Sequence, residues 1–321
     1  MKIKNMANQN VSIRQGLLRK EQKIFDEQIK DRIKHGFVPD LRSLRKVNWL
    51  YNNVWRDPEY VKIHWLPKVN FVLNAAKKGA GKVLEVGCGC GYLSLELARN
   101  GLDVVGVDIS EKSITIAKKY HSLNKFRKGF GKLSYRCCDI ASFNRGKEEF
   151  NSVVFFRSLH HMDDINKVLY NAHSLLKRNG NLIICEPVRG NFTRKSAEFA
   201  ALLRAILPTW EPYKKKITGL CSLEAWNDYV QRIYDEYTYK GEFEQSPMDN
   251  LTDSSKFILK AVRKRFKIKT IKFSDAFIDK LIGGLRGKDR YALARFLKFL
   301  DNYMVKHRML APTEITIHAK K

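Results

Sequence analysis

The sequence predicts an α/β protein built on a doubly wound, mostly parallel sheet. Two observations lead to this prediction. Short apolar runs rich in β-branched residues alternate with segments of helical periodicity between residues 82 and 186. The runs are apolar throughout, which is typical of parallel strands covered by helices on both faces. The 321 residues are enough for a sizeable core in one large domain or two modest ones.

The order of the elements follows from the same patterns. Strands are expected at residues 82–87, 103–108, 133–138, 152–156 and 181–186, with helices at 92–101, 111–123 and 164–180 between them. Ser110 is the expected N-cap of the second helix, and Gly180 closes the third. Before this core, helical periodicity covers residues 12–35 and is interrupted at 38–40. After it, helical patterns occupy most of 191–260. A strand is expected at 267–274, helices at 275–284 and 290–310, and a last strand at 314–321.

Composition narrows the class of protein. No apolar run reaches the roughly 18 residues of a membrane span, and the polar N-terminus lacks the apolar stretch of a secretory signal. Six cysteines without paired spacing predict a reduced, cytoplasmic compartment. The formal net charge is +27, and residues 251–321 alone carry 18 basic against 6 acidic side chains. Such a charge fits either a partner with phosphates, such as nucleic acid, or only a basic soluble surface.

The sharpest motif is Glu85-Val86-Gly87-Cys88-Gly89-Cys90-Gly91, which leaves the first strand and enters a helix. Glycines at alternate positions let a ligand lie against bare backbone, and this crossing lies beside the crevice at the carboxyl ends of the strands. A dinucleotide fingerprint would require glycine at position 92, which is tyrosine. The second strand ends in Asp108, 17 residues after Gly91, where a carboxylate can accept the hydroxyls of a ribose.

These features resemble motif I and the following strand of class I S-adenosylmethionine-dependent methyltransferases. The resemblance is strong over residues 81–187, and the FFRSLHHMDD strand end is similar to the small-molecule branch of that family. It implies a seven-stranded Rossmann-like fold, S-adenosylmethionine as cofactor, and an Asp at the third strand end that accepts from the adenine amino group. The cofactor-binding residues implied are Glu85, Gly87, Cys88, Gly89, Gly91, Asp108, Ile109, Asp139, Ile140 and Arg157.

The resemblance also suggests four segments. Residues 1–80 form an N-terminal helical segment that covers the cofactor site, and residues 81–190 form the cofactor-binding core. Residues 191–260 form a helical lid that selects the acceptor, and residues 261–321 complete the sheet. Tyr51, Trp55, Tyr60 and Trp65 either form part of the cover or only pack helices together.

The expected catalytic residues are His160 and His161, which follow the fourth strand. A histidine there can take a proton from the acceptor, and His160 is favoured over His161, although local hydrogen bonding is an equally open role. Alignment and desolvation alone can also accelerate transfer from an activated sulfonium. Arg189, after the fifth strand, is the expected acceptor-binding residue for a carboxylate or phosphate, unless it forms an ordinary surface ion pair.

The predicted function is methyl transfer to a hydroxyl, amine or carbon of a small molecule, a class that includes glycans, lipids and carrier-bound metabolites. The alternative is an RNA methyltransferase that uses the basic surface. The fourth strand lacks the Asn/Asp-Pro-Pro-aromatic motif of enzymes that methylate exocyclic amines of nucleic acids. No acidic cluster suggests a metal site, and nothing in the sequence supports a non-catalytic scaffold.

Overall fold

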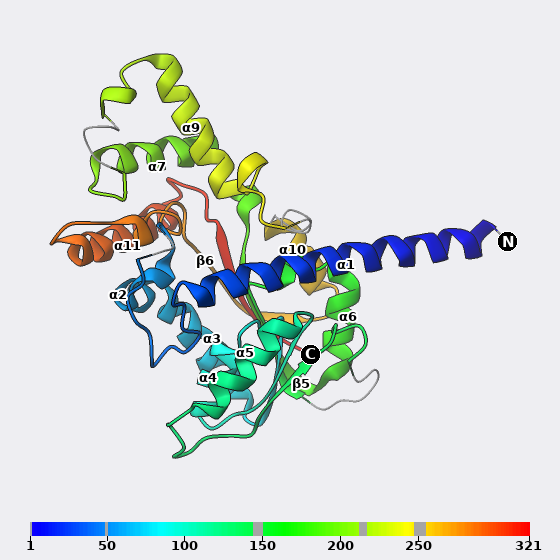
Figure 1. The fold of residues 1–321 in the computed structure, drawn as a ribbon. Helices are drawn as coiled ribbons and strands as arrows, with labels where there is room; N and C mark the ends of the chain where they lie inside the picture. The colour runs from blue at the N-terminus through cyan, green and yellow to red at the C-terminus, as the bar shows by residue number, and fades with distance from the viewer. Residues whose placement is uncertain (1, 49–50, 144–149, 212–216, 247–254) are drawn as a thin grey trace.

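The computed structural model describes residues 2–48, 51–143, 150–211, 217–246 and 255–321, and in them seven strands form one sheet (Figure 1). The strand order is β3-β2-β1-β4-β5-β7-β6. β7 runs antiparallel to both of its neighbours, and the other neighbouring pairs are parallel. This confirms the predicted doubly wound, mostly parallel sheet. The strands are β1 (Lys82–Val86), β2 (Asp103–Asp108), β3 (Leu133–Cys137), β4 (Phe150–Phe156), β5 (Leu176–Pro187), β6 (Lys267–Ser274) and β7 (Glu314–Lys320).

Helices surround the sheet. The hydroxyl of Ser110 accepts from the backbone N–H of Ser113 at 3.0 Å, which confirms the predicted N-cap of α5. The α-helices are α1 (Lys2–Lys34), α2 (Pro58–Tyr60), α3 (Leu66–Gly79), α4 (Tyr92–Arg99), α5 (Glu111–Ser122), α6 (Ile165–Leu175), α7 (Arg194–Ile206), α9 (Leu223–Thr238), α10 (Ser255–Arg263) and α11 (Arg290–Lys306). Short η-helices include η1 (Val54–Arg56), η3 (Leu159–His161) and η4 (Arg189–Asn191).

Two apolar layers bury the two faces of the sheet. Val83 and Val154 belong to the layer that also holds α3, α4 and α11, whereas Leu84 and Val153 belong to the layer that holds α6 and α10. Because successive residues of a strand point to opposite faces, an unbroken apolar run serves both layers. No helix among the described residues is both long and apolar enough to cross a bilayer.

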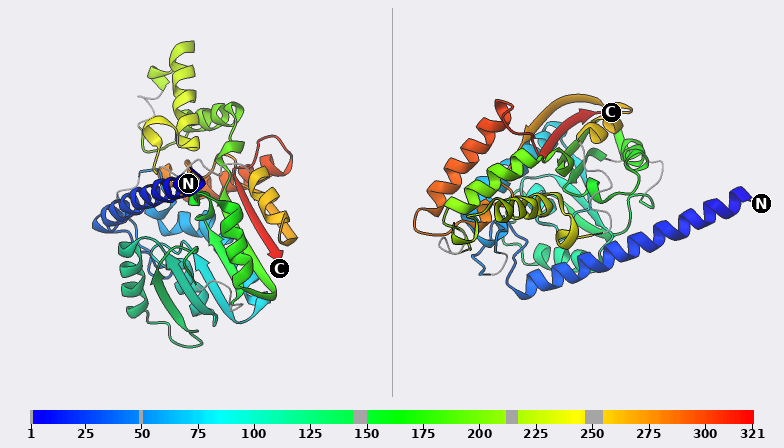
Figure 2. Two further views of the ribbon diagram at one scale, coloured as in Figure 1. Left: turned by 90° about the vertical axis from the view of Figure 1, so that its right-hand side faces the viewer. Right: turned by 90° about the horizontal axis from the view of Figure 1, so that it is seen from above.

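Two segments lie outside this sandwich. α1 crosses the molecule beside α5, and its N-terminal part projects well beyond the rest of the chain (Figures 1 and 2). α7 and α9 pack against each other at the far end of the molecule in Figure 1. The sequence predicts that both segments cover the site at the carboxyl ends of the strands. The residues of each segment that reach this site are described below.

Two predicted helices differ from the structure. The helix expected at 164–180 ends at Leu175, and β5 begins at Leu176, which is fully buried and pairs with Phe150. Burial of Leu176 in the sheet therefore overrides the helical propensity of the segment. The helix expected at 275–284 is replaced by bends and turns that end in the short 3-10 helix η6 (Ile282–Gly284). The Oδ1 atom of Asp301 accepts from the backbone N–H groups of residues 276–278, which fixes the first part of this segment.

Candidate active site

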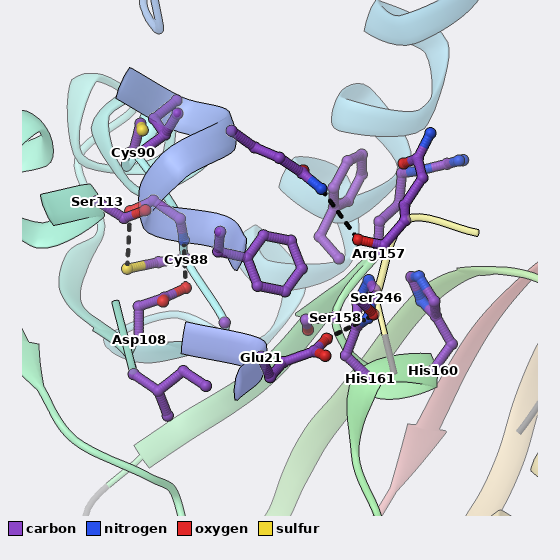
Figure 3. Close-up of a pocket in the computed structure, with 18 of the residues that line it drawn as sticks. Glu21, Cys88, Cys90, Asp108, Ser113, Arg157, Ser158, His160, His161 and Ser246 are labelled. Atoms are coloured by element: carbon purple, nitrogen blue, oxygen red, sulfur yellow. Dashed lines mark hydrogen bonds and ion pairs between the residues drawn. The ribbon is translucent and has the colours of Figure 1, made fainter. Parts of the chain in front are cut away.

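A cavity of about 370 Å³ lies at the carboxyl ends of the strands and is closed on one side by α1 (Figure 3). This volume lies in the range of small-molecule sites. The cavity brings together segments far apart in the sequence, from α1 to the loop after β6. The predicted site residues that line it are Glu85, Gly87, Cys88, Gly89, Asp108, Ile109, Asp139, Ile140, Arg157, His160, His161 and Arg189.

The glycines of the motif differ in their roles. Gly89 has φ +50°, and a Cβ atom built there meets no heavy atom within 4 Å, although the residue lines the cavity. At Gly91 a Cβ would lie 2.5 Å from the Tyr135 hydroxyl and 2.8 Å from Ala117 Cβ. Gly91 is not among the residues that line the cavity and is the N-cap residue of α4. Packing against Tyr135 and Ala117 explains the glycine at 91. At 89 the positive φ favours glycine, and the open space beside it leaves the backbone accessible to a ligand.

Asp108 connects the glycine loop with the end of β2. Its Oδ2 atom accepts from the backbone N–H of Gly89 and its Oδ1 atom from that of Ser110, both at 2.8 Å. Burial raises the pKa of Asp108, while these two N–H groups favour the carboxylate. The carboxylate is therefore fixed beside the open face of Gly89, where ribose hydroxyls can reach its remaining lone pairs.

The other residues predicted to bind the cofactor lie around Gly89 and Asp108 in the cavity. Asp139 lines the cavity, and its Oδ1 atom also accepts from the backbone N–H of Ala141 at 3.1 Å, so it caps the turn after β3 as well. Burial raises the pKa of Glu85 to about 8, so this group is mostly protonated at neutral pH. Glu85 accepts a hydrogen bond from the hydroxyl of Ser94. A protonated Glu85 can donate a hydrogen bond, which an ionised carboxylate cannot.

Arg157 lies at the end of β4, in a left-handed conformation with φ +56°. Its Nη1 atom donates to Glu314 Oε2 at 2.8 Å, and its Nη2 atom lies 3.7 Å from Asp279 Oδ2. Glu314 also accepts from the buried Lys68 at 2.6 Å. Burial alone would lower the pKa of Arg157, but Asp279 and Glu314 outweigh it and raise the pKa. Arg157 thus faces the cavity from a buried network of opposite charges.

His160 forms a carboxylate–imidazole pair with Glu186, the penultimate residue of β5. His160 Nδ1 lies 2.6 Å from Glu186 Oε2, and Glu186 Oε1 accepts from the backbone N–H groups of Ser158 and Leu159 at 2.8 Å. Burial raises the pKa of Glu186 to about 7 and lowers that of His160 well below its usual value. Because the backbone donors require an acceptor, we assign the proton to His160 Nδ1, which leaves Nε2 free to accept.

His161 lies on the same turn as His160 but contacts other residues. Its ring centroid lies 3.9 Å from that of His160, and its Nδ1 atom lies 3.0 Å from Glu21 Oε1. The hydroxyl of Ser246 lies 3.4 Å from the same Nδ1 atom. The ring of Phe25 packs edge-on against His161 at 5.1 Å. His161 therefore connects η3 with α1 and with the segment after α9.

Arg189 stacks on an aromatic ring in the wall of the cavity. Its guanidinium lies 4.0 Å from the ring centroid of Tyr239, and Lys280 donates to the Tyr239 hydroxyl at 2.5 Å. Burial alone would raise the pKa of Tyr239, but Lys280 and Arg189 outweigh it and lower the pKa. Tyr239 has φ +54° at the end of α9. Of the segment predicted as a lid, Tyr239, Gln245 and Ser246 line the cavity.

The predicted aromatic cover is realised in part. Trp55 and Trp65 line the cavity and pack against each other at 5.7 Å. Tyr60 is fully buried and donates to the backbone oxygen of Leu285 at 2.8 Å, so it belongs to the core. Tyr51 is 65% exposed. Two of the four aromatics thus cover the site, one packs elements together, and one faces solvent.

Several cavity residues were not predicted from the sequence. They come from α1 and from the loops before and after the sheet core, and no local motif marks them. The helical periodicity of α1 was the only signal, and it does not say which face meets the site. The unpredicted polar residues from these segments are Glu21, Gln28, Arg32, Asn52, Asn53, Tyr239, Gln245, Ser246, Asp279 and Lys280, and Ser113 and Ser158 join them from the core. The described residues contain no group of three or more His, Cys, Asp or Glu side chains placed to hold a metal.

Comparison with known proteins matches this chain to methyltransferases. The family model described as "Methyltransferase domain" matches residues 77–241. The "Ubiquinone biosynthesis O-methyltransferase" of Pelagibacter ubique is 32% identical over 131 residues, which are 41% of this chain and 51% of that protein. The protein of the same name from Chromobacterium violaceum is 31% identical over 147 residues, 44% of this chain and 60% of that protein. The chain thus spans about half the length of these curated relatives.

A solved structure extends the likeness to the fold. Geranyl diphosphate C-methyltransferase from Streptomyces coelicolor superposes with a TM-score of 0.52 at 14% identity, covering 92% of this chain and 97% of that one. At this identity the likeness concerns the fold. The matched family region contains β1, the glycine loop, Asp108, Asp139 and both histidines.

Proposed function

Since this chain belongs to the class I S-adenosylmethionine-dependent methyltransferases, we propose that it transfers the methyl group of that cofactor to a hydroxyl of a small molecule. One observation carries the proposal: Gly89 opens onto the cavity with room where its Cβ would be, directly beside the Asp108 carboxylate. That cradle fits an adenosyl ribose. The hydroxyl is proposed because curated relatives at 31–32% identity carry the name O-methyltransferase.

The residues present fit the cofactor by the chemistry of their donors and acceptors. When bound, S-adenosylmethionine supplies a methyl group on an activated sulfonium. Asp108 would accept from the ribose hydroxyls, and Asp139 from the adenine amino group. Ile109 and Ile140, with half-buried and buried side chains, would pack against the adenosyl group. The other residues proposed to hold the cofactor are Glu85, Gly87, Cys88, Gly89 and Arg157.

His160 is the proposed general base. With its Nδ1 proton directed at Glu186, the imidazole is held in one tautomer and can accept a proton at Nε2. Burial keeps the imidazole of His160 neutral at neutral pH, so it can accept a proton without first losing one.

His161 is proposed to help position the acceptor beside His160. Arg189 is proposed to contact the acceptor from the wall that it shares with Tyr239.

Exclusion of water is the second contribution proposed for the chain. Trp55 and Trp65 close the cavity from the N-terminal segment, and Phe25 closes it from α1. An activated sulfonium needs mainly alignment and protection from water. The arrangement therefore supports a small acceptor that is enclosed together with the cofactor. Because the net charge is +27, RNA is the alternative acceptor against which this proposal is tested.

A labelling experiment tests the proposal. The protein is incubated with S-adenosylmethionine that carries a tritiated methyl group and, separately, with lipid, water-soluble and RNA fractions of a cell extract. We expect label in the lipid or water-soluble fraction, in a product whose new bond is an O-methyl ether. Label confined to RNA would instead establish the alternative acceptor class, and absence of label from every fraction would contradict methyl transfer.

A further inference from the structure

Glu21 is a buried carboxylate on α1 that faces the cavity. Its residue is 1% exposed, and it lines the cavity together with Asp108 and the two histidines. Its Oε1 atom lies 3.0 Å from His161 Nδ1, whereas its Oε2 atom has no hydrogen-bond partner among the described residues. A carboxylate removed from water is costly unless a donor or a cation compensates it. His161 can pair with Oε1, and a donor or cation on a ligand can satisfy Oε2.

Contacts on both sides fix this position. Asp26, on the same helix, accepts from the hydroxyl of Ser110 at 2.5 Å, which ties α1 to the end of β2. Gln28 donates to the backbone oxygen of Gln245 at 3.1 Å, which ties α1 to the segment after α9. Figure 3 shows Glu21 between Asp108 and the histidines, with its carboxylate directed towards His161.

The position of Glu21 in the cavity indicates which chemical group it can bind. Asp108 marks the proposed ribose end of the cofactor, and His160 and His161 mark the proposed acceptor end. The sulfonium that carries the methyl group must lie between these two ends. A buried carboxylate at this junction is well suited to a positive charge or to an N–H donor.

We propose that Glu21 binds the positively charged methyl-donating centre of the cofactor and so distinguishes the cationic donor from the neutral thioether product. This inference rests on the proposed function. Methyl transfer removes the charge from sulfur, so Glu21 loses its partner once the product has formed. The chain would then hold S-adenosylmethionine more tightly than S-adenosylhomocysteine, and α1 would contribute directly to that difference.

Two cofactor analogues test this without any acceptor. S-Adenosylhomocysteine has a neutral sulfur, whereas sinefungin carries a protonated amine on the carbon that replaces sulfur, where the methyl group would be. Calorimetry gives the ratio of their dissociation constants for the unsubstituted 321-residue chain and for Glu21→Gln. We expect the unsubstituted chain to prefer sinefungin, and Glu21→Gln to reduce that preference about tenfold or more, the effect of losing a charged hydrogen bond.

The matched control is Glu27→Gln, which removes the same charge from an exposed position on the same helix. It should leave the ratio unchanged. Because the ratio cancels any general loosening of α1, it reports on the charge alone. An unchanged ratio in Glu21→Gln, with normal binding of S-adenosylhomocysteine, would overturn the inference but not the proposed function. If the unsubstituted chain bound neither analogue, the proposed function and this inference would both fail.

Discussion

Substituting Gly89 by valine should abolish binding of S-adenosylmethionine while leaving the chain folded. The Cβ at this position points into open space, so the protein itself does not clash with the new side chain. The branched side chain would instead occupy the face of the backbone on which the ribose is proposed to lie. Placing a side chain on a residue with φ +50° should lower the free energy of unfolding by roughly 1–2 kcal/mol. Calorimetric titration with S-adenosylhomocysteine measures the loss, and thermal unfolding checks the fold.

Gly129→Val is the matched control for that backbone cost. Gly129 has φ +67°, meets nothing within 4 Å of an added Cβ, and is not among the residues that line the cavity. It should show a comparable loss of stability with unchanged cofactor affinity. If Gly89→Val folded and bound the cofactor as tightly as Gly129→Val does, the glycine loop would not be a cofactor cradle.

His160→Ala should lower kcat by about 10²–10⁴-fold on the acceptor identified by methyl labelling, the usual contribution of a general base. The geometry behind this expectation is the pair with Glu186, which directs the Nδ1 proton and leaves Nε2 as the acceptor. Cofactor affinity should change little, because the proposed ribose and adenine contacts lie on other strand ends. Steady-state kinetics together with calorimetry separates the two effects.

The pH dependence of kcat gives an independent test of the same role. A base works only when deprotonated, so kcat should fall as the pH drops through the pKa of His160. Because burial lowers this pKa well below its usual value, the acidic limb should lie below pH ~6.5, the value for free imidazole. The limb should be lost in His160→Ala. A limb that persists unchanged in the variant would assign His160 to structure and leave alignment and desolvation as the mechanism.

The proposed cofactor half of the cavity could be predicted because its residues follow strand ends in a short stretch of sequence. Parallel strands place their carboxyl ends along one edge, so Gly89, Asp108 and Asp139 had to meet once the strands were recognised. The role of Gly91 was less accessible, because the contact that requires glycine there, with Tyr135, joins residues 44 positions apart. A glycine in a motif does not show by itself whether a ligand or a neighbouring side chain requires it.

The acceptor half depended on tertiary contacts that no local pattern encodes. Glu21 reaches the cavity because Asp26 and Gln28 anchor the same helix to two separate segments. Tyr239 and Lys280 meet across 41 positions of sequence. Helical periodicity predicted helices around Glu21 and Tyr239, but it did not show which of their many polar side chains turn inwards. Similar reasons explain the early end of α6, where burial of Leu176 beside Phe150 decided the structure.

The central claim is that the cavity between the glycine loop and α1 binds the methyl donor in one orientation. A crystal structure of the 321-residue chain with S-adenosylhomocysteine tests it most directly. We predict that the ribose lies on Gly89 with its hydroxyls donating to Asp108, that the adenine lies beside Asp139, and that the sulfur lies between Asp108 and the pair His160 and His161. Density for the ligand outside this cavity, or a ribose that makes no contact with Asp108, would contradict the account.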